Sequence, residues 1–593
     1  DGFHDLVSAL QPLGSKLGLW YGPIGGYGGP TVTHRATRVA VGRERGMEIT
    51  SNGEYLCLAG KNYSKYFRDT LLQMQKAYNI NYFKLDGIPF GCNGADHGHP
   101  VGIYSREADA RVFINILQAL RSQSAEVFLN ITTSIWLSPW WLKYADTVWM
   151  GGADTGYHET VPAMTLRQSA MTYRDAVFYN DFRRHEAQFP MSSLMTHGII
   201  KAKYNMLGGE QESLDDWKDA VVNALSVGTM LVKLYPTPEL LNPEEWDALG
   251  RTLQWAGKNA HPLLDNSTFV LGDPGRREAY GFLHFSTDKT IVTLRNPFIR
   301  PVPVRVKLDE QSGFERNERT FIAEVVFPFR KVLAGNLGYG DTLQTELEGY
   351  EQRVIELRPV RPQEVQIFDV RYSVESPARD GPTLRVYGAE GAEETVRLSN
   401  PANYQKAYID GGKVLLTPSG SETMLKVRFG KKGSTVSNPS FSAPLLRLSE
   451  ASSAEQTLQL SFEVQIPPDF RQSKIALLIE PTAETKGITA QGRDSGHPLS
   501  INVENGGGGL WYWFTCEVEP GKHSIDFEIH VPGTEKASAQ LSGWLLTKRA
   551  LVSKELRLTF KPGLVLSMPP ENLLPASAEF ERKTYALFER KSP

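Results

Sequence analysis

The stretch YSKYFRDTLLQMQKAYNINYFKLDG, residues 63–87, shows how the N-terminal part of the chain folds. Apolar side chains recur at three- and four-residue spacing through 63–78, which is the pattern of an amphipathic helix. These side chains are Tyr66, Phe67, Leu71, Met74 and Tyr78. The next segment, NYFKLDG at 81–87, has the composition of a buried strand and ends in an acidic residue, Asp86. A helix followed at once by such a strand is typical of a parallel α/β sheet.

The same alternation of short apolar runs and helical patterns continues from residue 1 to 262. Strands are expected at 16–22, 81–87, 126–133, 146–152, 192–199 and 228–235, and further helices at 106–122 and 214–228. Parallel strands that are each followed by a helix predict a (β/α)8-type barrel, here without its first strands. In such barrels the functional side chains lie at the C-terminal ends of the strands.

After residue 262 the pattern changes to short alternating strands separated by Gly, Pro and Asn, as in TIVTLRNPF at 290–298. This pattern is typical of β-sandwich domains. We place domain boundaries at 263–360, 361–445 and 446–593, the last with a less regular tail. The predicted fold class is therefore α/β plus all-β.

Composition excludes several classes of partner. The 593 residues include 64 basic and 67 acidic ones, a net charge of −3 without long single-sign runs. We therefore expect neither a nucleic acid nor an anionic membrane as partner. No apolar run reaches the roughly 18 to 20 residues that span a bilayer.

Three cysteines, Cys57, Cys92 and Cys516, are too few and too scattered to predict a disulfide framework or a thiolate metal site. We expect no metal and no cofactor. The first residues, DGFHDLVSAL, lack the pattern of a signal peptide. Any secretion signal would lie upstream, and a secreted or periplasmic location is expected.

Asp86 is the first candidate for chemistry, because it ends the apolar strand at 81–87. Lys84 precedes it by two residues and points to the same side of the strand, since side chains alternate. An ammonium beside the carboxylate favours the charged form that a nucleophile requires. The alternative is an Asp that caps the next helix or forms a structural ion pair.

Asp154 is the second candidate, in WMGGADT at 149–155. It lies close to the end of the strand expected at 146–152, the second strand after the one that carries Asp86. The glycines before it would let the backbone approach a ligand closely. A second carboxyl group opposite the first could serve as acid and base. The alternative is a turn or a helix N-cap, where Asp is also common.

These two motifs together resemble glycoside hydrolase clan D, especially its family 36 α-galactosidases and the related α-N-acetylgalactosaminidases. Residues 58–87 look like the stretch that leads to the clan's nucleophile, where a strand ends in Lys-x-Asp. GSKLGLWYGP at 14–23 is similar to the preceding barrel strand, and GGADTGY at 151–157 to the segment with the acid/base. The matches are ordered and spaced as in the clan and cover residues 1 to about 240.

The resemblance implies a retaining hydrolysis of terminal α-linked galactose or N-acetylgalactosamine by double displacement, with an oligosaccharide or glycoconjugate as substrate. Asp86 would form the covalent intermediate, and Asp154 would protonate the leaving oxygen and then activate water. The implied sugar contacts are Lys84, Trp20, Tyr21 and Asn130. For Asn130 a glycosylation acceptor or a structural amide remains equally open.

Two features depart from the clan pattern. Many members have an Arg four residues before the acid/base, where it binds the substituent at C2, but this chain has Met150 there. The segment GCNGADHGH at 91–99 is also unlike the standard enzymes. Its Cys92, Asp96, His97 and His99 could bind a metal, but their spacing fits no familiar zinc pattern. We favour a loop in which Asp96 and His97 contact the substrate over an ordinary solvated loop.

Three further sites stay open. Trp136, just after the strand at 126–133, could stack on a sugar or pack between a helix and the barrel. Asp181 in YNDFRRHE is a reserve candidate for the acid/base. Trp511 and Trp513 lie on one face of a strand, either as a carbohydrate-binding platform or, as we favour, in a sandwich core.

Two other functions compete with this prediction. A retaining α-glycosidase for α-glucosides would also use a strand-end aspartate, and a barrel that binds carbohydrate without turnover could keep the same residues. The oligomeric state stays undetermined. The strand at 16–22 resembles the third strand of the clan rather than its first. We therefore expect about two βα units, and an upstream β-sandwich, to lie before Asp1 in the same protein or in a separate chain.

Overall fold

The computed structural model describes residues 2–26, 32–88, 90–133, 137–153, 156, 158–203, 207, 212–361, 364–376, 381–400, 403–452, 455–506, 508–532, 539–562 and 571–590. The chain divides into two compact units. The N-terminal unit consists of 1–152, 185–196 and 229–233, and the large unit consists of 153–184, 197–228 and 234–593. Each unit is described by itself below.

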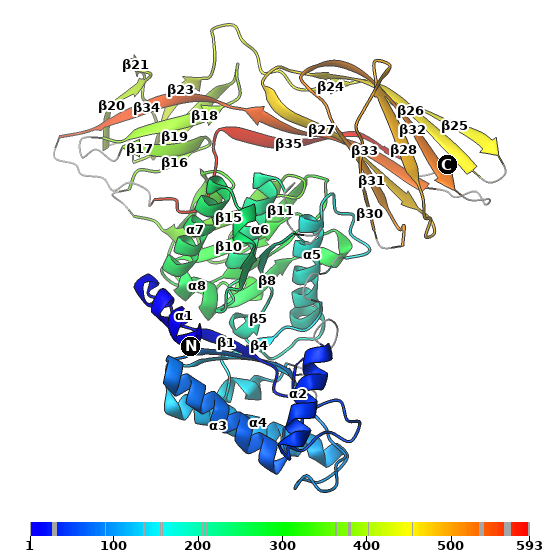
Figure 1. Cartoon of the computed structure of the whole chain (residues 1–593). Helices are drawn as coiled ribbons and strands as arrows, with labels where there is room; N and C mark the ends of the chain where they lie inside the picture. The colour runs from blue at the N-terminus through cyan, green and yellow to red at the C-terminus, as the bar shows by residue number, and fades with distance from the viewer. Residues whose placement is uncertain are drawn as a thin grey trace. The chain divides into compact units, whose positions relative to one another are not determined.

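The N-terminal unit is built on a five-stranded sheet in the order β1-β2-β3-β4-β5 (Figure 1). Every strand pair in it is parallel. Its strands are β1 (Gly18–Tyr21), β2 (Tyr82–Ile88), β3 (Phe128–Thr133), β4 (Thr147–Trp149) and β5 (Leu194–Met195). Among the described strands β1 pairs with β2 alone, so this sheet is open and does not form a closed barrel.

Helices α3 (Lys61–Tyr78) and α4 (Ile103–Gln123) lie side by side against this sheet (Figure 1). The predicted helix at 63–78 is confirmed by α3. It buries one face at four-residue spacing, through Tyr63, Phe67, Leu71 and Gln75. Asn79 ends α3 in the left-handed conformation, with φ of 50°, and its N–H bonds the Gln75 carbonyl, as expected of a helix C-terminus. The other helices of the unit are α1 (Gly2–Leu10) and α2 (Val32–Glu44).

The large unit begins with helices and a short parallel pair of strands. These elements are α5 (Leu166–Tyr179), β6 (Ile199–Lys201), α6 (Leu214–Ser226), β7 (Leu234–Pro236), α7 (Pro243–Lys258) and α8 (Ala260–Asp265). The expected strand at 192–199 is thus two short strands, β5 and β6, which belong to different sheets. Helix α7 starts with Pro243 and a capping box between Asn242 and Glu245, so its first N–H groups are satisfied.

Residues 263–360 form most of a sheet against which these helices pack. Trp255 and Val222 from the helices share a core with Ile291 and Val354 from the sheet. The strands are β8 (Ser267–Leu271), β9 (Tyr280–His284), β10 (Thr290–Arg295), β11 (Val302–Lys307), β12 (Phe321–Phe327), β13 (Lys331–Leu337), β14 (Thr342–Leu347) and β15 (Gln352–Pro359). The antiparallel pair β11 and β14 lies over the sheet and closes a second core around Phe314.

The sheet does not stop at residue 360. A parallel pairing of β13 with β16 (Ile367–Phe368) extends it to ten strands in the order β22-β23-β19-β16-β13-β12-β15-β10-β9-β8. The added strands are β19 (Glu393–Ser399), β22 (Thr417–Ser419) and β23 (Glu422–Arg428). The domains expected at 263–360 and 361–445 therefore share one sheet. Strand patterning predicts that these segments are β-structure but not which strands pair with each other.

The second sheet of that region also contains a strand from a segment that was assigned to another domain. Its order is β17-β18-β34-β20-β21, so it includes β34 (Val552–Phe560), which lies in the sequence between two strands of the third β-domain. The other members are β17 (Arg371–Ser376), β18 (Thr383–Gly388), β20 (Tyr404–Ile409) and β21 (Gly412–Val414). Leu556 and Leu558 of β34 complete the core with Tyr372 and Val396. Residues 552–560 thus belong to the second β-domain and not to the third, where the sequence pattern placed them.

The third β-domain is a sandwich of two antiparallel sheets with a shared core. Their strands are β24 (Ser440–Phe441), β25 (Leu445–Ser452), β26 (Glu455–Ile466), β27 (Phe470–Pro481), β28 (Thr489–Asp494), β29 (His497–Pro498), β30 (Asn502–Asn505), β31 (Tyr512–Glu517), β32 (Gly521–Pro532), β33 (Ala539–Ala550) and β35 (Phe580–Arg590). Trp511 and Trp513 are buried in a cluster with Phe298 and Trp544. This cluster is separate from the shared core of the two sheets, which contains the alternate residues Tyr512 and Phe514. The two rings are buried against residues of the 263–360 region, such as Phe298, so the prediction that they lie in the sandwich core is wrong.

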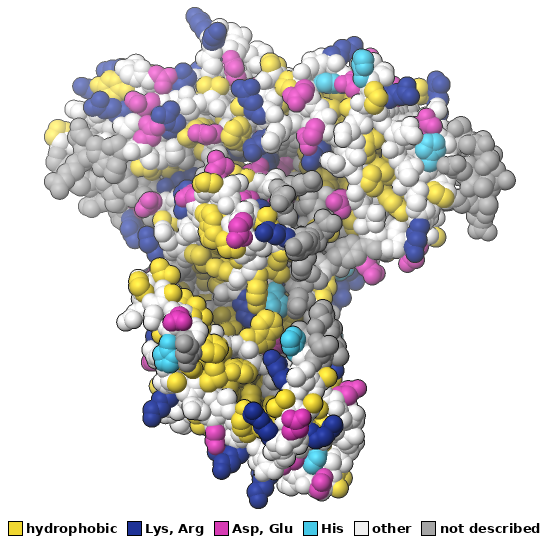
Figure 2. Space-filling model, in the orientation of Figure 1, with side chains coloured by type: hydrophobic (Ala, Val, Ile, Leu, Met, Phe, Trp, Pro, Cys, Tyr) yellow, Lys and Arg dark blue, Asp and Glu magenta, His cyan; other side chains and the backbone are white. Residues whose placement is uncertain are grey.

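Basic and acidic side chains are interspersed over the face of the molecule in view (Figure 2). This distribution agrees with the small net charge of −3. Of the helices that the structure describes, none is both long and apolar enough to cross a membrane.

Candidate active site

Three neighbouring strands of the N-terminal unit place polar and aromatic side chains in one row. The register pairs Trp20 of β1 with Lys84 of β2, and Lys84 with Asn130 of β3. Residues paired in a parallel sheet point to the same face, and the next residue of each strand points to the other. The strands thus build a row of functional groups on one face, which we call the Lys84 row.

Lys84 and Asp86 form a buried ion pair at the end of β2. The Lys84 Nζ lies 3.1 Å from the Asp86 Oδ2, and each side chain is only 4% exposed. The prediction that both side chains share one face of the strand is confirmed. In a setting of low dielectric such a pair is strongly coupled, so the removal of either partner leaves an uncompensated charge.

The indole ring of Trp20 completes the surroundings of Lys84. The ammonium lies 4.2 Å from the ring centroid, within the range of a cation–π contact. Trp20 is nevertheless 58% exposed. An apolar ring that is half open to solvent next to a buried ion pair is a suitable surface for the C–H face of a sugar.

Asn130 contributes an amide whose hydrogen bonds are only partly satisfied. Its Nδ2 donates to the Thr147 Oγ1 of β4 at 2.8 Å. Its Oδ1 is buried and has no hydrogen-bond partner among the described residues, and the same holds for the Thr132 Oγ1 two residues later. A buried acceptor without a donor costs about 1 to 3 kcal/mol, so a hydroxyl that reaches it would be bound favourably.

Tyr21 does not join the Lys84 row. Its hydroxyl lies 2.9 Å from the Met74 Sδ, and its ring packs edge to face on Phe67 of the same helix, α3. It therefore faces α3, opposite to Trp20. The expectation that both residues line one pocket is corrected, because adjacent residues of a strand cannot point to the same side.

The other candidates lie elsewhere. Asp154 and Trp136 lie outside the described residues. Asp181 is buried in a π-helical turn after α5, in the large unit. The Asp96 side chain is 94% exposed, and its Oδ1 lies 3.6 Å from the His97 Nε2. Met150 is buried, and its N–H bonds the Met195 carbonyl.

The loop after β2 also forms a cluster that sequence spacing did not predict. Cys57, which precedes α3, lies next to Cys92, His97 and His99, and their donor atoms lie within 4.8 Å of one another. A cavity of about 580 Å³ is lined by both cysteines together with Phe90, Arg106 and other residues. The sequence analysis did not connect Cys57 with this cluster, because a separation of 35 positions between Cys57 and Cys92 gives no motif.

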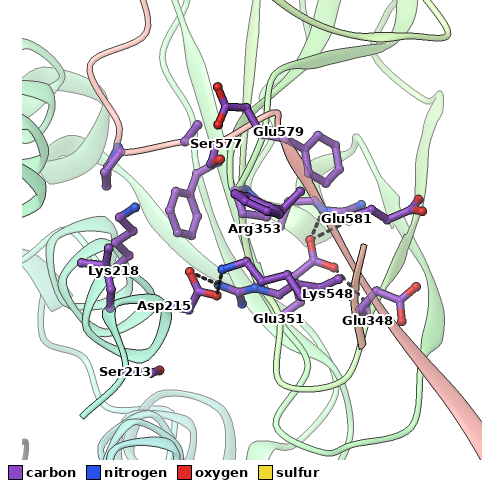
Figure 3. Close-up of a pocket in the computed structure, with 18 of the residues that line it drawn as sticks. Ser213, Asp215, Lys218, Glu348, Glu351, Arg353, Lys548, Ser577, Glu579 and Glu581 are labelled. Carbon is purple, nitrogen blue, oxygen red and sulfur yellow. Dashed lines mark hydrogen bonds and ion pairs between the residues drawn. The ribbon is translucent and has the colours of Figure 1, made fainter. Parts of the chain in front are cut away.

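The large unit contains a more strongly charged cavity of about 760 Å³ (Figure 3). Asp215 of α6 pairs there with Lys548 of β33 at 2.9 Å and with Arg582 of β35 at 3.4 Å. Glu351 pairs with Arg353 at 2.6 Å. Burial raises the pKa of Glu348 in the same cavity to about 7. These charges join three parts of the unit and neutralise one another.

No family model matches the sequence, and no curated protein does. Solved structures with some likeness include the GH36 α-galactosidase AgaA of Geobacillus stearothermophilus, with a TM-score of 0.43, 13% identity, and coverage of 60% of this chain and 46% of that one. The galactosidase domain of the α-galactosidase–sucrose kinase AgaSK gives 0.41 and 15%, with 60% and 45% covered. An α-amylase of Geobacillus thermoleovorans gives 0.38 and 13%, with 60% and 80% covered. The chain thus spans about half the length of these galactosidases, and such values assign it neither a family nor an activity.

Proposed function

We propose that this chain is a retaining α-glycosidase that hydrolyses terminal α-linked galactose or N-acetylgalactosamine, with Asp86 as its nucleophile. The observation that carries the proposal is the buried Lys84–Asp86 pair at the end of a parallel strand, with an N···O distance of 3.1 Å. The exposed ring of Trp20 lies in the same row, as does the Asn130 oxygen, which has no hydrogen-bond partner among the residues that the structure describes. A carboxylate, a cation, a hydrogen-bond acceptor and an apolar ring are the groups that a sugar ring requires.

The first chemical step is a displacement at the anomeric carbon. A carboxylate oxygen of Asp86 would attack C1, the bond from C1 to the glycosidic oxygen would break, and a glycosyl ester would form. Asp154 would donate its proton to the leaving oxygen. In the second step a water would give a proton to Asp154 and its oxygen to C1, which releases Asp86. We assign Asp154 from its place in the motif and expect roughly 5 to 6 Å between the two carboxyl groups.

The Lys84 row would bind the sugar in that reaction. Lys84 keeps hydrogens that its contact with Asp86 does not use, since an ammonium has three donors. The Asn130 Oδ1 would accept a hydrogen bond from a hydroxyl, and Trp20 would stack on the apolar face of the ring. Met150 brings no charge to the place where related enzymes bind the C2 substituent, so both galactose and N-acetylgalactosamine are retained as substrates.

A carbohydrate-binding protein without turnover is the second candidate. It is favoured by the low exposure of Asp86, because a nucleophile that is 4% exposed needs an opening before it can reach a substrate. The ring of Trp20 beside it is 58% exposed and would still contact a sugar without that opening. Hydrolysis and binding therefore have to be measured separately.

The decisive experiment combines a substrate panel with covalent trapping. Nitrophenyl glycosides of both anomers and several sugars would be tested, and turnover of the α-galactoside or α-N-acetylgalactosaminide is expected. A galacto-configured cyclitol aziridine, which traps the nucleophile as an ester, should label one peptide, that with Asp86. A preference for α-glucosides would contradict the specificity, and a label on another carboxylate would contradict the nucleophile. Sugar binding without hydrolysis of any glycoside would establish the second candidate.

The role of Asp154 needs its own test. Asp154→Ala should slow substrates with poor leaving groups roughly 10²- to 10⁴-fold and spare activated aryl glycosides, which need little protonation. Equal losses on both substrate types would contradict Asp154 as the acid.

A further inference from the structure

Two loops of the N-terminal unit bring four metal-binding side chains to one point. Cys57 lies just before α3, whereas Cys92, His97 and His99 lie between β2 and α4. In the part of the chain that the structure describes, this is the single place where three or more His, Cys or carboxylate groups gather closely enough to hold an ion. Both cysteines are buried, at 1% and 5% exposure, and both are free thiols.

The distances match a tetrahedral site. The Cys57 Sγ lies 3.1 Å from the His99 Nε2, and the Cys92 Sγ lies 3.3 Å from the His97 Nδ1. All four donor atoms lie within 4.8 Å of one another. A tetrahedron with Zn–S bonds of about 2.3 Å and Zn–N bonds of about 2.0 Å has edges of about 3.3 to 3.8 Å. The two Sγ–N edges at 3.1 and 3.3 Å need to lengthen by a few tenths of an ångström, and the other four edges are no longer than 4.8 Å.

The second nitrogen of each imidazole already faces an oxygen acceptor. The His99 Nδ1 lies 2.8 Å from the Pro100 carbonyl, which leaves the Nε2 free to ligate. The His97 Nε2 lies 3.6 Å from an Asp96 carboxylate oxygen, which leaves the Nδ1. Ligating histidines are usually oriented in this way, by a carbonyl or carboxylate behind the ring. The ring orientations therefore suit ligation by the two nitrogens that face the sulfurs.

The backbone of both loops is held in place for these four side chains. The Gly94 N–H points at the Cys92 Sγ at 3.4 Å, and a Cβ at Gly94 would lie 2.3 Å from the His97 ring. One buried carboxylate ties the loops together, because Asp109 accepts from the Ala59 N–H and the Gly91 N–H, each at 2.8 Å. The site thus has an outer shell as well as four ligands.

We propose that Cys57, Cys92, His97 and His99 bind one structural Zn²⁺ ion. Two thiolates and two imidazoles in a tetrahedral arrangement are the donor set that selects zinc among the common divalent ions. Four protein ligands leave no open position, so the ion is structural and not catalytic. A Cys57–Cys92 disulfide would use the sulfurs but would leave two imidazoles converging on them for no purpose.

Zinc at this point would tie the loop before α3 to the loop that follows β2. That second loop begins a few residues after Asp86, so the ion would fix the chain at the C-terminal end of the strand that carries the proposed nucleophile. Zinc binding is independent of the proposed hydrolysis. A chain without turnover could still bind zinc, and a chain without zinc could still hydrolyse the glycoside.

The test is the metal content of the full chain, expressed with added zinc and freed of any histidine tag. Elemental mass spectrometry should find about one zinc ion per chain. Cys57→Ser and Cys92→Ser should each lower this to below about a tenth. Cys516→Ser makes the same change in a buried cysteine of β31 in the large unit, and this matched control should keep its zinc.

A second measurement covers the case in which the serine variants do not fold. The native chain, stripped by a chelator and refilled with Co²⁺, should show the intense visible bands of tetrahedral cobalt and a thiolate charge-transfer band in the near ultraviolet. Absence of bound metal, an octahedral cobalt spectrum, or zinc retained by the folded Cys57→Ser/Cys92→Ser chain would overturn the proposal. So would an intact mass that is lower by two hydrogens, because it would reveal a Cys57–Cys92 disulfide.

Discussion

The Lys84 row of the N-terminal unit and the charged cavity of the large unit use the same kinds of side chain in different ways. In the row, one ammonium and one carboxylate lie 3.1 Å apart, beside a half-exposed ring and a buried amide oxygen that has no donor in the described part of the chain. In the cavity, Asp215 has two cationic partners, at 2.9 and 3.4 Å. Cations and carboxylates there come from separate segments that they hold together.

This difference distinguishes a region suited to ligand binding from a region that stabilises the fold. Native proteins satisfy nearly all buried polar groups, so a buried acceptor that stays unpaired calls for an explanation. In the cavity the charges neutralise one another across helices and strands, as expected of a structural network. Each region has a buried oxygen without a donor among the described residues, the Asn130 Oδ1 and the Asp219 Oδ1. The row adds the ring of Trp20, which is 58% exposed and can be reached by a ligand. Activity should therefore depend on the row and stability on the cavity.

The largest expected effect is on turnover, from a change in the row. Asp86→Asn should lower kcat for the α-galactoside by roughly 10³-fold or more, because an amide cannot form the glycosyl ester. The same variant leaves the Lys84 ammonium buried without an anion, which should cost about 3 kcal/mol in the free energy of unfolding. Steady-state kinetics and urea unfolding measure the two effects.

A double variant tells these two effects apart. Lys84→Met/Asp86→Asn removes both buried charges, so most of the stability should return while turnover stays lost. Asp69→Asn, the same change at an exposed position on α3, is the matched control. Recovery of turnover in the double variant would contradict a chemical role for Asp86.

The second effect concerns the cavity. Arg582→Met removes the cation that lies 2.8 Å from the Asp219 Oδ2, whose side chain is 2% exposed. The other oxygen of Asp219 has no hydrogen-bond partner among the described residues. The free energy of unfolding should fall by about 3 kcal/mol, since the loss is limited by uptake of a proton. Urea unfolding, with Lys583→Met on the exposed side of β35 as control, measures it.

Activity of the folded Arg582→Met chain should stay as in the native chain. The double variant Arg582→Met/Asp219→Asn should regain most of the lost stability, as the corresponding pair in the row does. If the loss of Arg582 lowered kcat at temperatures where the chain is folded, the division between the two regions would fail.

Local patterns predicted much of this architecture, and non-local pairings account for what they missed. The 3.6-residue period predicts α3, and alternation along β2 brings Lys84 and Asp86 to one face. The same alternation separates Trp20 from Tyr21, so the assignment of both to one pocket could have been avoided. No pattern along the chain joins β34 to a sheet more than a hundred residues earlier, or Cys57 to Cys92, because these contacts depend on the packing of whole domains.

The third effect is on substrate affinity. Trp20→Ala removes the ring that would stack on the sugar and should raise KM roughly tenfold with little change in kcat, which corresponds to about 1.4 kcal/mol. Stability should change little, because the side chain is 58% exposed. Trp140→Ala, which removes an indole that is 69% exposed in the same unit, is the matched control. A loss of kcat alone would show that Trp20 acts on the chemistry and not on binding.

The fourth effect is a dependence of stability on pH that arises in the cavity. Burial raises the pKa of Glu348 from 4.5 to about 7, and the carboxylates of Glu351 and Glu346 add to the shift. The folded state therefore holds the proton more tightly than the unfolded state. This contribution to stability is complete below about pH 4.5 and is lost as the pH rises through about 7.

Glu348→Gln is neutral at every pH, so its free energy of unfolding should fall less steeply than that of the native chain between these values. Urea midpoints at several pH values measure the slope, with Glu318→Gln at an exposed position as control. Equal slopes in Glu348→Gln and the native chain would show that Glu348 is ionised in the folded cavity throughout, and that its neighbours stabilise its charge as they do for Asp215.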